Sequence, residues 1–241
     1  MPDYAEIYAT RAADYHRLVA AEDAAGAVSA WLASHLAPGP TGPTLTAQDE
    51  VLDVGAGTGR VTAFLAAHTS ARLVASDGAA AMLDELRATW PPHLGPTPET
   101  VVADYRALPF ADHRFAAVTA GWALGHLTGF HPDTWPEEAA SALSELERVA
   151  RPGAPILLFE TLGTGSPAPA APRDSLAALY ATFEARGFVR TTLRTDYRFA
   201  SRADAEHLVG FFFGTAKLAA LRDSTDGTTL IEWTGAWVKH R

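Results

Sequence analysis

The chain has 241 residues, of which 48% are hydrophobic and 20% charged, which excludes a wholly disordered protein and allows a complete globular core. It has no cysteine, which excludes disulfides, thiolate catalysis and thiolate-bound metals. The formal net charge of −9, with arginines scattered along the chain, disfavours nucleic acid as a partner and favours a small molecule.

The first residues are acidic and contain no apolar run, so they do not predict a signal peptide. No segment is long and apolar enough to predict a membrane span, and we therefore expect a cytoplasmic protein. The histidines are spread out with no H-x-x-x-H pair, so no metal site is expected. The sequence indicates no oligomeric state.

Residues 1–37 are rich in alanine and predict one or two helices, and the Pro/Gly-rich residues 38–43 predict a loop. Strands and helices then alternate, which is typical of βαβ units with a parallel sheet. The predicted strands are 50–54, 72–76, 101–103, 115–120 and 155–160, and the predicted helices are 58–68, 79–90 and 135–150.

The pattern changes after residue 161. A Gly/Ser/Pro/Ala-rich loop is predicted at 163–172, followed by a helix at 175–186, a strand at 188–199, a helix at 203–221 and a strand at 228–238. The last two strands are candidates for an antiparallel edge on the parallel sheet. The sequence thus predicts one α/β domain over 1–241, with a helical cap at 1–37, a core at 50–160 and a substrate-side region at 161–241.

The strongest motif runs from Val51 to Arg60 and reads V-L-D-V-G-A-G-T-G-R, between a predicted strand and a predicted helix. Glycines at 55 and 57 allow a sharp turn and a close approach of ligand to backbone. A tight turn without a ligand is the alternative. The dinucleotide fingerprint G-x-G-x-x-G does not match, because Arg60 or Thr62 stands where its third glycine is required.

Two acids follow later strands. Asp77 ends the second strand, where a carboxylate can accept both hydroxyls of a ribose; the alternative is a cap for the next helix. Asp104 and Tyr105 follow the third strand, where a carboxylate can accept from an exocyclic amine; the alternative is a solvated loop acid. Together these motifs indicate a ligand with a ribose and an adenine at the carboxyl edge of a doubly wound sheet.

Residues 50–160 resemble class I S-adenosylmethionine-dependent methyltransferases of the small-molecule type that includes the ubiquinone/menaquinone-biosynthesis methyltransferases. The resemblance is carried by five segments: 51–59, Ser76-Asp77-Gly78 with Met82, Ala103-Asp104-Tyr105, Leu108-Pro109-Phe110 with Phe115-Ala116-Ala117-Val118, and residues 147–154. It implies a Rossmann-like, mostly parallel seven-stranded sheet with an antiparallel last strand.

The resemblance also implies a role for each matching residue. Asp53 and the backbone of Gly55, Ala56 and Gly57 would hold the methionine part of S-adenosylmethionine. Asp77 would take the ribose hydroxyls, with Gly78 and Met82 lining the adenosine site. Asp104 and Tyr105 would face the adenine, the backbone of Ala120 and Gly121 would pass the methionyl amine, and Tyr15 resembles a tyrosine that closes over the cofactor. The family's usual acid or Asn near residues 119–121 is missing here, and Gly78 replaces a more usual Ser or Pro.

The expected function is methyl transfer to a small, apolar or aromatic acceptor, with S-adenosylhomocysteine as the second product. His126 is the candidate base, and a packed loop histidine is the alternative. Trp122, Tyr4, Tyr8 and the run Phe211-Phe212-Phe213 are candidates for the acceptor site or for the core. A cofactor-binding protein without catalysis, or an NAD-dependent oxidoreductase, are the competing functions.

Overall fold

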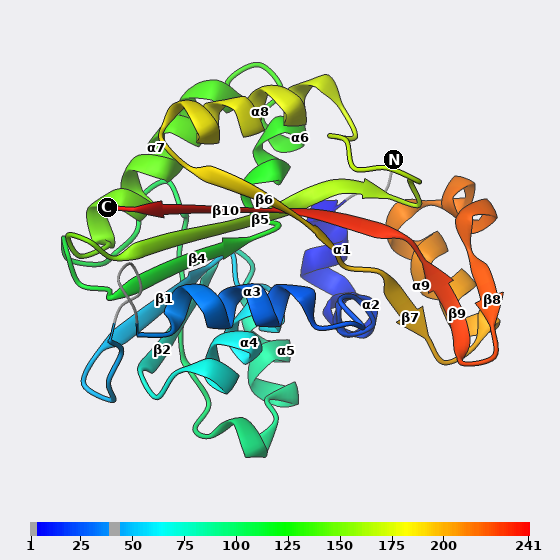
Figure 1. The fold of residues 1–241 in the computed structure, drawn as a ribbon, viewed down its shortest axis with the longest axis horizontal. Coiled ribbons are helices and arrows are strands. Elements are labelled where there is room, and N and C mark those ends of the chain that lie inside the picture. Colours follow the sequence, from blue (N-terminus) through cyan, green and yellow to red (C-terminus); the bar gives the residue numbers. More distant parts are fainter. Residues whose placement is uncertain (1–3, 39–43) are drawn as a thin grey trace.

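The computed structural model describes residues 4–38 and 44–241. Residues 1–3 of the predicted cap and most of the predicted loop at 38–43 lie outside this range. The main sheet has seven strands in the order β3-β2-β1-β4-β5-β10-β6 (Figure 1). These strands are β1 (Glu50–Val54), β2 (Arg72–Asp77), β3 (Glu99–Val102), β4 (Ala117–Gly121), β5 (Pro155–Thr164), β6 (Val189–Arg194) and β10 (Glu232–His240).

The first five strands are parallel, and β10 is antiparallel to both of its neighbours, β5 and β6. This confirms the expected mostly parallel, seven-stranded α/β fold with an antiparallel last strand. The last strand lies inside the sheet, however, and β6 forms the edge. Because β1 and β4 are neighbours from which the chain departs to opposite sides, the carboxyl ends of these two strands open a crevice for ligands.

Helices cover both faces of the sheet (Figure 1). On one face lie α3 (Ala27–Leu36), α4 (Arg60–His68) and α5 (Ala80–Thr89); on the other lie α6 (Leu127–Phe130), α7 (Trp135–Val149) and α8 (Asp174–Ala185). Short 3₁₀ turns occupy Pro92–Leu94 and Leu124–His126. No helix in the described part of the chain is long and apolar enough to cross a membrane.

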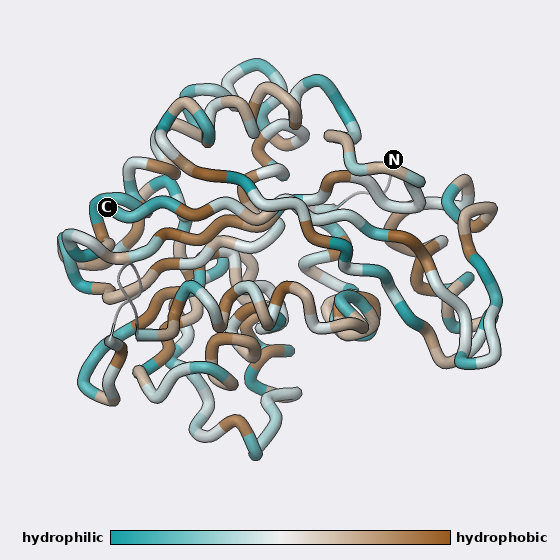
Figure 2. The backbone as a smooth tube through the Cα atoms, viewed as in Figure 1, coloured by the Kyte–Doolittle hydropathy of each residue, from teal (hydrophilic) through white to brown (hydrophobic). Residues whose placement is uncertain are grey.

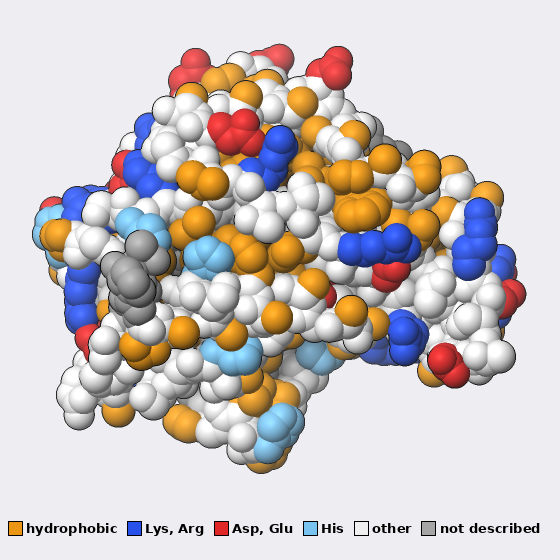
Figure 3. Space-filling view, in the orientation of Figure 1, with side chains coloured by type: hydrophobic (Ala, Val, Ile, Leu, Met, Phe, Trp, Pro, Cys, Tyr) orange, Lys and Arg blue, Asp and Glu red, His pale blue; other side chains and the backbone are white. Residues whose placement is uncertain are grey.

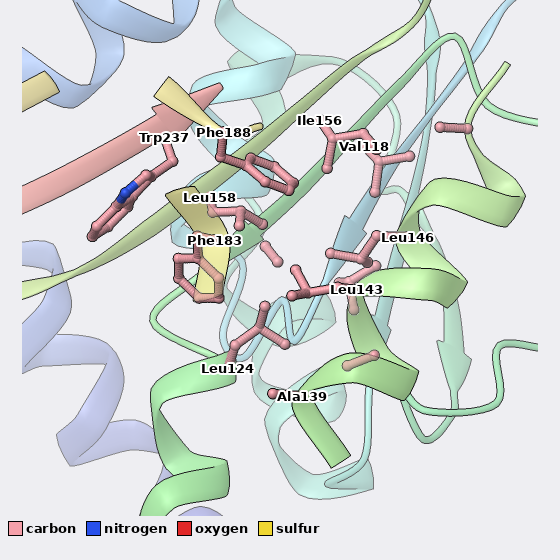
Figure 4. Close-up of a cluster of buried hydrophobic side chains, with 14 of the residues drawn as sticks. Val118, Leu124, Ala139, Leu143, Leu146, Ile156, Leu158, Phe183, Phe188 and Trp237 are labelled. Carbon is pink, nitrogen blue, oxygen red and sulfur yellow. The ribbon is translucent and has the colours of Figure 1, made fainter. Parts of the chain in front are cut away.

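Strand β5 shows why both faces are covered. Its residues 155–160 are buried without interruption: Ile156 and Leu158 point toward α7 and α8, whereas Leu157 and Phe159 point toward α3 and α4. The hydrophobic colour of the central strands in Figure 2 reflects this continuous burial. Figure 4 shows the larger core, where the labelled side chains of Val118, Leu143, Leu146, Ile156, Leu158, Phe183, Phe188 and Trp237 meet.

The N-terminal segment folds into three helices, α1 (Tyr4–Thr10), α2 (Ala12–Ala20) and α3, and not into one or two. The unexpected break comes after α2, where Asp23 has a φ of 60° and its carboxylate accepts hydrogen bonds from the backbone N–H groups of Ala27 (2.7 Å) and Val28 (2.9 Å). Asp23 therefore holds the first turn of α3 and prevents α2 from continuing. Helix α3 joins the helical layer, and α1 and α2 remain as the cap.

The tail differs most from expectation. The single strand predicted at 188–199 is two strands, β6 and β7 (Tyr197–Phe199), and the strand predicted at 228–238 is β9 (Gly227–Leu230) and β10. Strands β7 and β9 form a separate three-stranded sheet with β8 (Arg222–Ser224). The helix predicted at 203–221 ends as α9 (Arg202–Phe213), because Gly214 adopts a φ of 85°, and a 3₁₀ helix (Thr215–Ala220) follows.

Strand β5 continues to Thr164, four residues beyond the predicted end, because the start of β10 pairs with it. The predicted loop at 163–172 is correspondingly shorter. On the face of the molecule in Figure 3, Lys and Arg side chains lie in separate small groups among acidic and hydrophobic ones. Within residues 4–38 and 44–241, no group of three or more His, Asp or Glu side chains is arranged to hold a metal ion.

Candidate functional site

The glycine-rich turn between β1 and α4 is shaped by its close neighbours. Gly55 has a φ of 63°, and a Cβ atom there would lie 2.4 Å from the Cβ of Ala123. Gly57 has a φ of 57°, and a Cβ there would come within 3.4 Å of the Met82 side chain and 3.7 Å of the Tyr15 ring. Gly55 therefore lets the turn pack against the segment after β4, and Gly57 keeps its backbone open to a cavity.

Asp77 at the end of β2 fixes this turn. One of its carboxylate oxygens accepts a hydrogen bond from the Gly57 N–H (2.8 Å), and the other accepts one from the Ala79 N–H (2.8 Å) just before α5. Burial raises the pKa of Asp77, while these two N–H donors act to lower it. Asp77 thus supports the start of α5 and also the glycine turn, and each oxygen keeps a further lone pair that can accept from a ligand.

Asp53 lies beneath the glycine turn and is buried. Its carboxylate oxygens accept hydrogen bonds from the hydroxyls of Thr62 (2.6 Å) and Thr119 (2.7 Å). Burial raises the pKa of Asp53 to about 6. Thr119 lies within 119–121, where the resemblance implies an acid or Asn, and here its hydroxyl donates to Asp53. Asp53 is therefore placed to hold the floor of the turn.

Asp104 and Tyr105 follow β3 and line the same cavity as the glycine turn. The Asp104 carboxylate accepts from the backbone N–H of Arg106 (2.9 Å) and pairs with its guanidinium, which lowers the pKa of Asp104. Arg106 reaches onward to Glu138 (2.9 Å) on α7. Asp104 is thus half-exposed and also ion-paired, which lies between the two alternatives from the sequence, a ligand-facing carboxylate and a solvated loop acid. The sequence analysis did not identify Arg106 as its partner.

These residues surround a cavity of about 560 Å³, which we call the glycine-loop cavity. Most of the predicted cofactor residues line it, namely Tyr15, Gly55, Gly57, Asp77, Gly78, Met82, Asp104, Tyr105 and Gly121, together with His126. Asp53 and Ala56 line only a much smaller hollow next to it, and Ala120 is buried in the core. The structure therefore brings ten of the thirteen predicted site residues to one cavity.

Helices α1 and α2 close this cavity on one side. The Tyr8 hydroxyl shares a 2.8 Å hydrogen bond with Nε2 of His126, and the Tyr8 and Tyr15 rings meet edge to face with centroids 5.3 Å apart. Burial, helped by the charge of Arg173, lowers the pKa of His126 to about 4. The imidazole is consequently neutral at neutral pH, and burial makes it a weaker base than a free histidine.

A second cavity of about 580 Å³, the aromatic cavity, adjoins the first. Tyr8, Tyr15, Trp122 and His126 line both cavities and form the boundary between them. Other walls of the aromatic cavity come from the cap and tail, and its aromatic members are Tyr4, Tyr197, Phe212 and Phe213. The two cavities thus lie side by side and share these four side chains.

The three consecutive phenylalanines divide their roles, as their positions on a helix require. Phe212 contacts Tyr4 (5.1 Å between centroids) and Tyr15 (5.4 Å), and Phe213 packs against Tyr197 (5.9 Å). The Phe211 ring lies 4.3 Å from the Arg11 guanidinium carbon and does not line the cavity. Phe212 and Phe213 therefore pack against a buried cluster and also line the aromatic cavity, whereas Phe211 does neither.

Three buried glutamates also line the aromatic cavity, and the sequence reasoning missed all of them. Glu22 pairs with Arg60 (2.5 Å) and accepts from the Tyr197 hydroxyl (2.7 Å). Glu160 lies in the middle of β5 and accepts from the Gly125 N–H (2.8 Å), and Glu232 begins β10 and accepts from the Thr161 hydroxyl (2.6 Å). An acid following the apolar run Ile156 to Phe159 was the available signal for Glu160.

We expect Glu160→Gln to stabilise the protein progressively as the pH rises. Burial raises the pKa of Glu160 from 4.5 to about 8, so its contribution to stability is complete below pH 4.5 and is lost as the pH rises to 8. Glutamine keeps an acceptor for Gly125 and does not ionise. The gain in unfolding free energy over the wild type should reach a few kcal/mol at pH 9, at about 1.4 kcal/mol per unit of pKa shift.

Chemical denaturation of both proteins at pH 5, 7 and 9 measures this difference. Glu137→Gln, an exposed position on α7, is the matched control and should show no pH-dependent gain. A constant difference between Glu160→Gln and the wild type across this range would contradict the burial of an ionisable carboxyl at Glu160.

Comparison with known proteins identifies the central segment. Residues 51–153 match a family model described as a methyltransferase domain. The chain is 38% identical over 116 residues to a malonyl-[acyl-carrier protein] O-methyltransferase of Halorhodospira halophila, covering 47% of this chain and 35% of that protein. It is 31% identical over 113 residues to the ubiquinone/menaquinone biosynthesis C-methyltransferase UbiE of Desulfotalea psychrophila, covering 46% and 41%. The aligned segment spans well under half of each relative.

The fold comparison extends over the whole chain. A solved SAM-dependent methyltransferase from Aquifex aeolicus aligns with a TM-score of 0.51 at 12% identity, over 98% of this chain and 93% of that one. Identity at this level shows the fold and not the substrate. Residues 51–153 thus match the methyltransferase domain family, and the chain shares its fold with a solved SAM-dependent methyltransferase.

Proposed function

We propose that this protein transfers the methyl group of S-adenosylmethionine to a small-molecule acceptor. The observation that carries the proposal is the pair of adjoining cavities at the carboxyl edge of the sheet. The glycine-loop cavity holds the cofactor and the aromatic cavity holds the acceptor. Tyr8, Tyr15, Trp122 and His126 form the boundary across which the methyl group passes.

The residues of the glycine-loop cavity fit this cofactor. Its volume of about 560 Å³ lies in the usual range for small-molecule sites. Asp77 offers its remaining lone pairs to the two ribose hydroxyls, and Met82 gives an apolar surface for the adenosine. A side chain at position 57 would narrow the cavity between Met82 and Tyr15, so the glycine there keeps room for the amino-acid end. We assign Asp53 a supporting role, through Thr62 and the glycine turn.

S-adenosylmethionine supplies an electrophilic methyl group when bound, so the chain need not form a covalent intermediate. The chain's own residues bind the two ligands, align them and exclude water. Tyr8 and Tyr15 close the site from the cap. His126, neutral and held by Tyr8, is placed at the boundary to take a proton from an acceptor that carries one.

Calorimetric titration with S-adenosylmethionine, S-adenosylhomocysteine and NADH tests the cofactor. We expect saturable one-to-one binding of the first two and none of NADH, because Arg60 occupies the position of the third dinucleotide glycine and its guanidinium is engaged by Glu22 and lies 3.4 Å from the Trp122 ring centre. Preferential binding of NADH would instead support the dehydrogenase. Release of S-adenosylhomocysteine with a panel of acceptors then separates an enzyme from a cofactor-binding protein without turnover.

The organisation proposed with this function is a single domain over 1–241. The cap and the tail are parts of one catalytic unit, because α1, α2, α9 and the end of β5 all contribute walls to the aromatic cavity. A cytoplasmic location and the lack of a nucleic-acid partner stay predictions from the sequence.

A further inference from the structure

The inner wall of the aromatic cavity carries two carboxyl groups on neighbouring strands. Glu160 on β5 is 4% exposed and Glu232 on β10 is 1% exposed, and both line the cavity. Glu160 accepts from the Gly125 N–H and Glu232 from the Thr161 hydroxyl. The second oxygen of Glu232 is buried and has no hydrogen-bond partner among the described residues.

Neither carboxyl group forms an ion pair with a described residue, although the positive charge of Arg60 acts on Glu232 and favours its ionised form. The third glutamate of the cavity differs, because Glu22 is paired with Arg60. The two other cations of the cavity, Arg173 and Lys217, are exposed; Arg173 donates to the Thr128 hydroxyl (3.3 Å) and Lys217 to the Thr164 carbonyl oxygen (2.7 Å). Ionising a buried carboxyl group costs free energy unless a positive charge lies beside it. A ligand that carries a cation can supply that charge.

The rest of the wall is suited to the same kind of ligand. Tyr4, Tyr8, Tyr15 and Phe212 form a continuous set of ring contacts, with centroids 5.1 to 6.4 Å apart. Aromatic faces attract a cation and also bury an apolar body. The wall therefore combines apolar surface with buried carboxyl groups that can ionise when a cation binds.

We infer that the aromatic cavity binds a small molecule with a protonated amine and an apolar or aromatic body, and that a buried carboxyl group of its wall, Glu160 or Glu232, receives the ammonium group. This deepens the proposed function, on which it rests for the role of the cavity as acceptor site. Burial raises the pKa of both carboxyl groups to about 8, so each is largely protonated without a ligand and a bound ammonium group would favour its ionised form. Arg173 and Lys217 are exposed, unlike the two carboxyl groups.

Calorimetry with three probes of one shape tests the inference. Phenethylamine, 2-phenylethanol and 3-phenylpropanoate are titrated into the full chain, each with and without saturating S-adenosylhomocysteine. We expect the amine to bind at least about tenfold more tightly than the alcohol. Hydrogen bonds that involve charged groups are stronger than those between neutral groups, and the difference in free energy corresponds to about this factor in affinity. The acid should bind most weakly.

The double variant Glu160→Gln, Glu232→Gln should remove the preference for the amine and leave the affinity for the alcohol nearly unchanged. Both substitutions keep an acceptor oxygen and remove a buried ionisable group, so the variant is expected to fold, and its thermal midpoint checks this. Glu137→Gln is the control and should keep the wild-type preference. Equal affinity for amine and alcohol, or a preference that survives the double variant, would overturn the inference.

A preference for the acid would also overturn it and would point to Arg173 and Lys217. The two proposals can fail separately. If S-adenosylhomocysteine binds and the amine does not, the proposed function stands and the inference is wrong. If the amine binds selectively and S-adenosylhomocysteine does not, the amine site stands and the cofactor assignment is wrong.

Discussion

Asp77→Ala is expected to lower the affinity for S-adenosylhomocysteine by about 100-fold or more. The change removes the acceptor proposed for two ribose hydroxyls, and each hydrogen bond to a charged group contributes about 1.5–3 kcal/mol. It also frees the Gly57 N–H, which Asp77 holds at 2.8 Å, so the glycine turn loses its preorganised shape. Calorimetric titration of both proteins gives the ratio of dissociation constants.

Two further variants separate these effects. Asp77→Asn keeps one acceptor oxygen and should fall between the wild type and Asp77→Ala. Asp84→Ala removes an exposed acid on α5, paired with Arg87, and should bind like the wild type. If Asp77→Ala binds within about threefold of the wild type, a difference of under about 0.7 kcal/mol, then Asp77 only holds the turn and caps the approach to α5.

Trp237→Ala is expected to destabilise the fold by about 3–5 kcal/mol, the usual cost of removing a large buried aromatic side chain. Trp237 is fully buried on β10, where its ring packs against Tyr180 (4.9 Å between centroids) and Phe183 (5.4 Å) from α8 (Figure 4). The indole also covers Gly235, where a Cβ atom would lie 2.3 Å from the ring. The variant leaves a cavity between the sheet and α8.

The matched variant is Trp237→Phe. The indole N–H has no hydrogen-bond partner among the described residues, so this change removes an unpaired buried donor and keeps most of the packing. We expect it to cost much less than the alanine variant, of the order of 1 kcal/mol. Urea denaturation gives both values, and equal losses in the two variants would mean that the indole N–H has a partner in solution.

The core of the fold was predictable because its signals are local. Strand β1 was predicted at 50–54 and lies there, since an apolar run leads directly into three alternate glycines. The tail was not predictable in this way, because the break between β6 and β7 depends on residues distant in sequence. The Thr195 hydroxyl shares a hydrogen bond with the Thr234 hydroxyl (2.8 Å), and the backbone N–H of Thr195 donates to the Glu232 carbonyl oxygen (2.9 Å). No pattern within 188–199 marks the point where the chain leaves one sheet for another.

The same distinction applies to the site. The glycine-loop cavity is built from turns that follow successive strands, so motif and strand order together predict its residues. The aromatic cavity is assembled from the cap, the end of β5 and the tail, and the pairing of Glu22 with Arg60 joins residues 38 positions apart. Burial of Glu160 and Glu232 depends on the neighbouring strand, which sequence periodicity alone does not identify.

The position of the two cavities relative to the methyltransferase segment has a consequence for how the protein can diversify. The glycine-loop cavity is formed mainly within residues 51–153, whereas most walls of the aromatic cavity come from the cap and from residues after 153. Under the proposed function, acceptor choice can thus change by substitution in the tail without disturbing the cofactor cavity, whereas Tyr8 and Tyr15 of the cap line both cavities. Transplanting the segment after residue 153 between relatives should move acceptor preference as a module, with cofactor affinity inherited from the central segment and the cap.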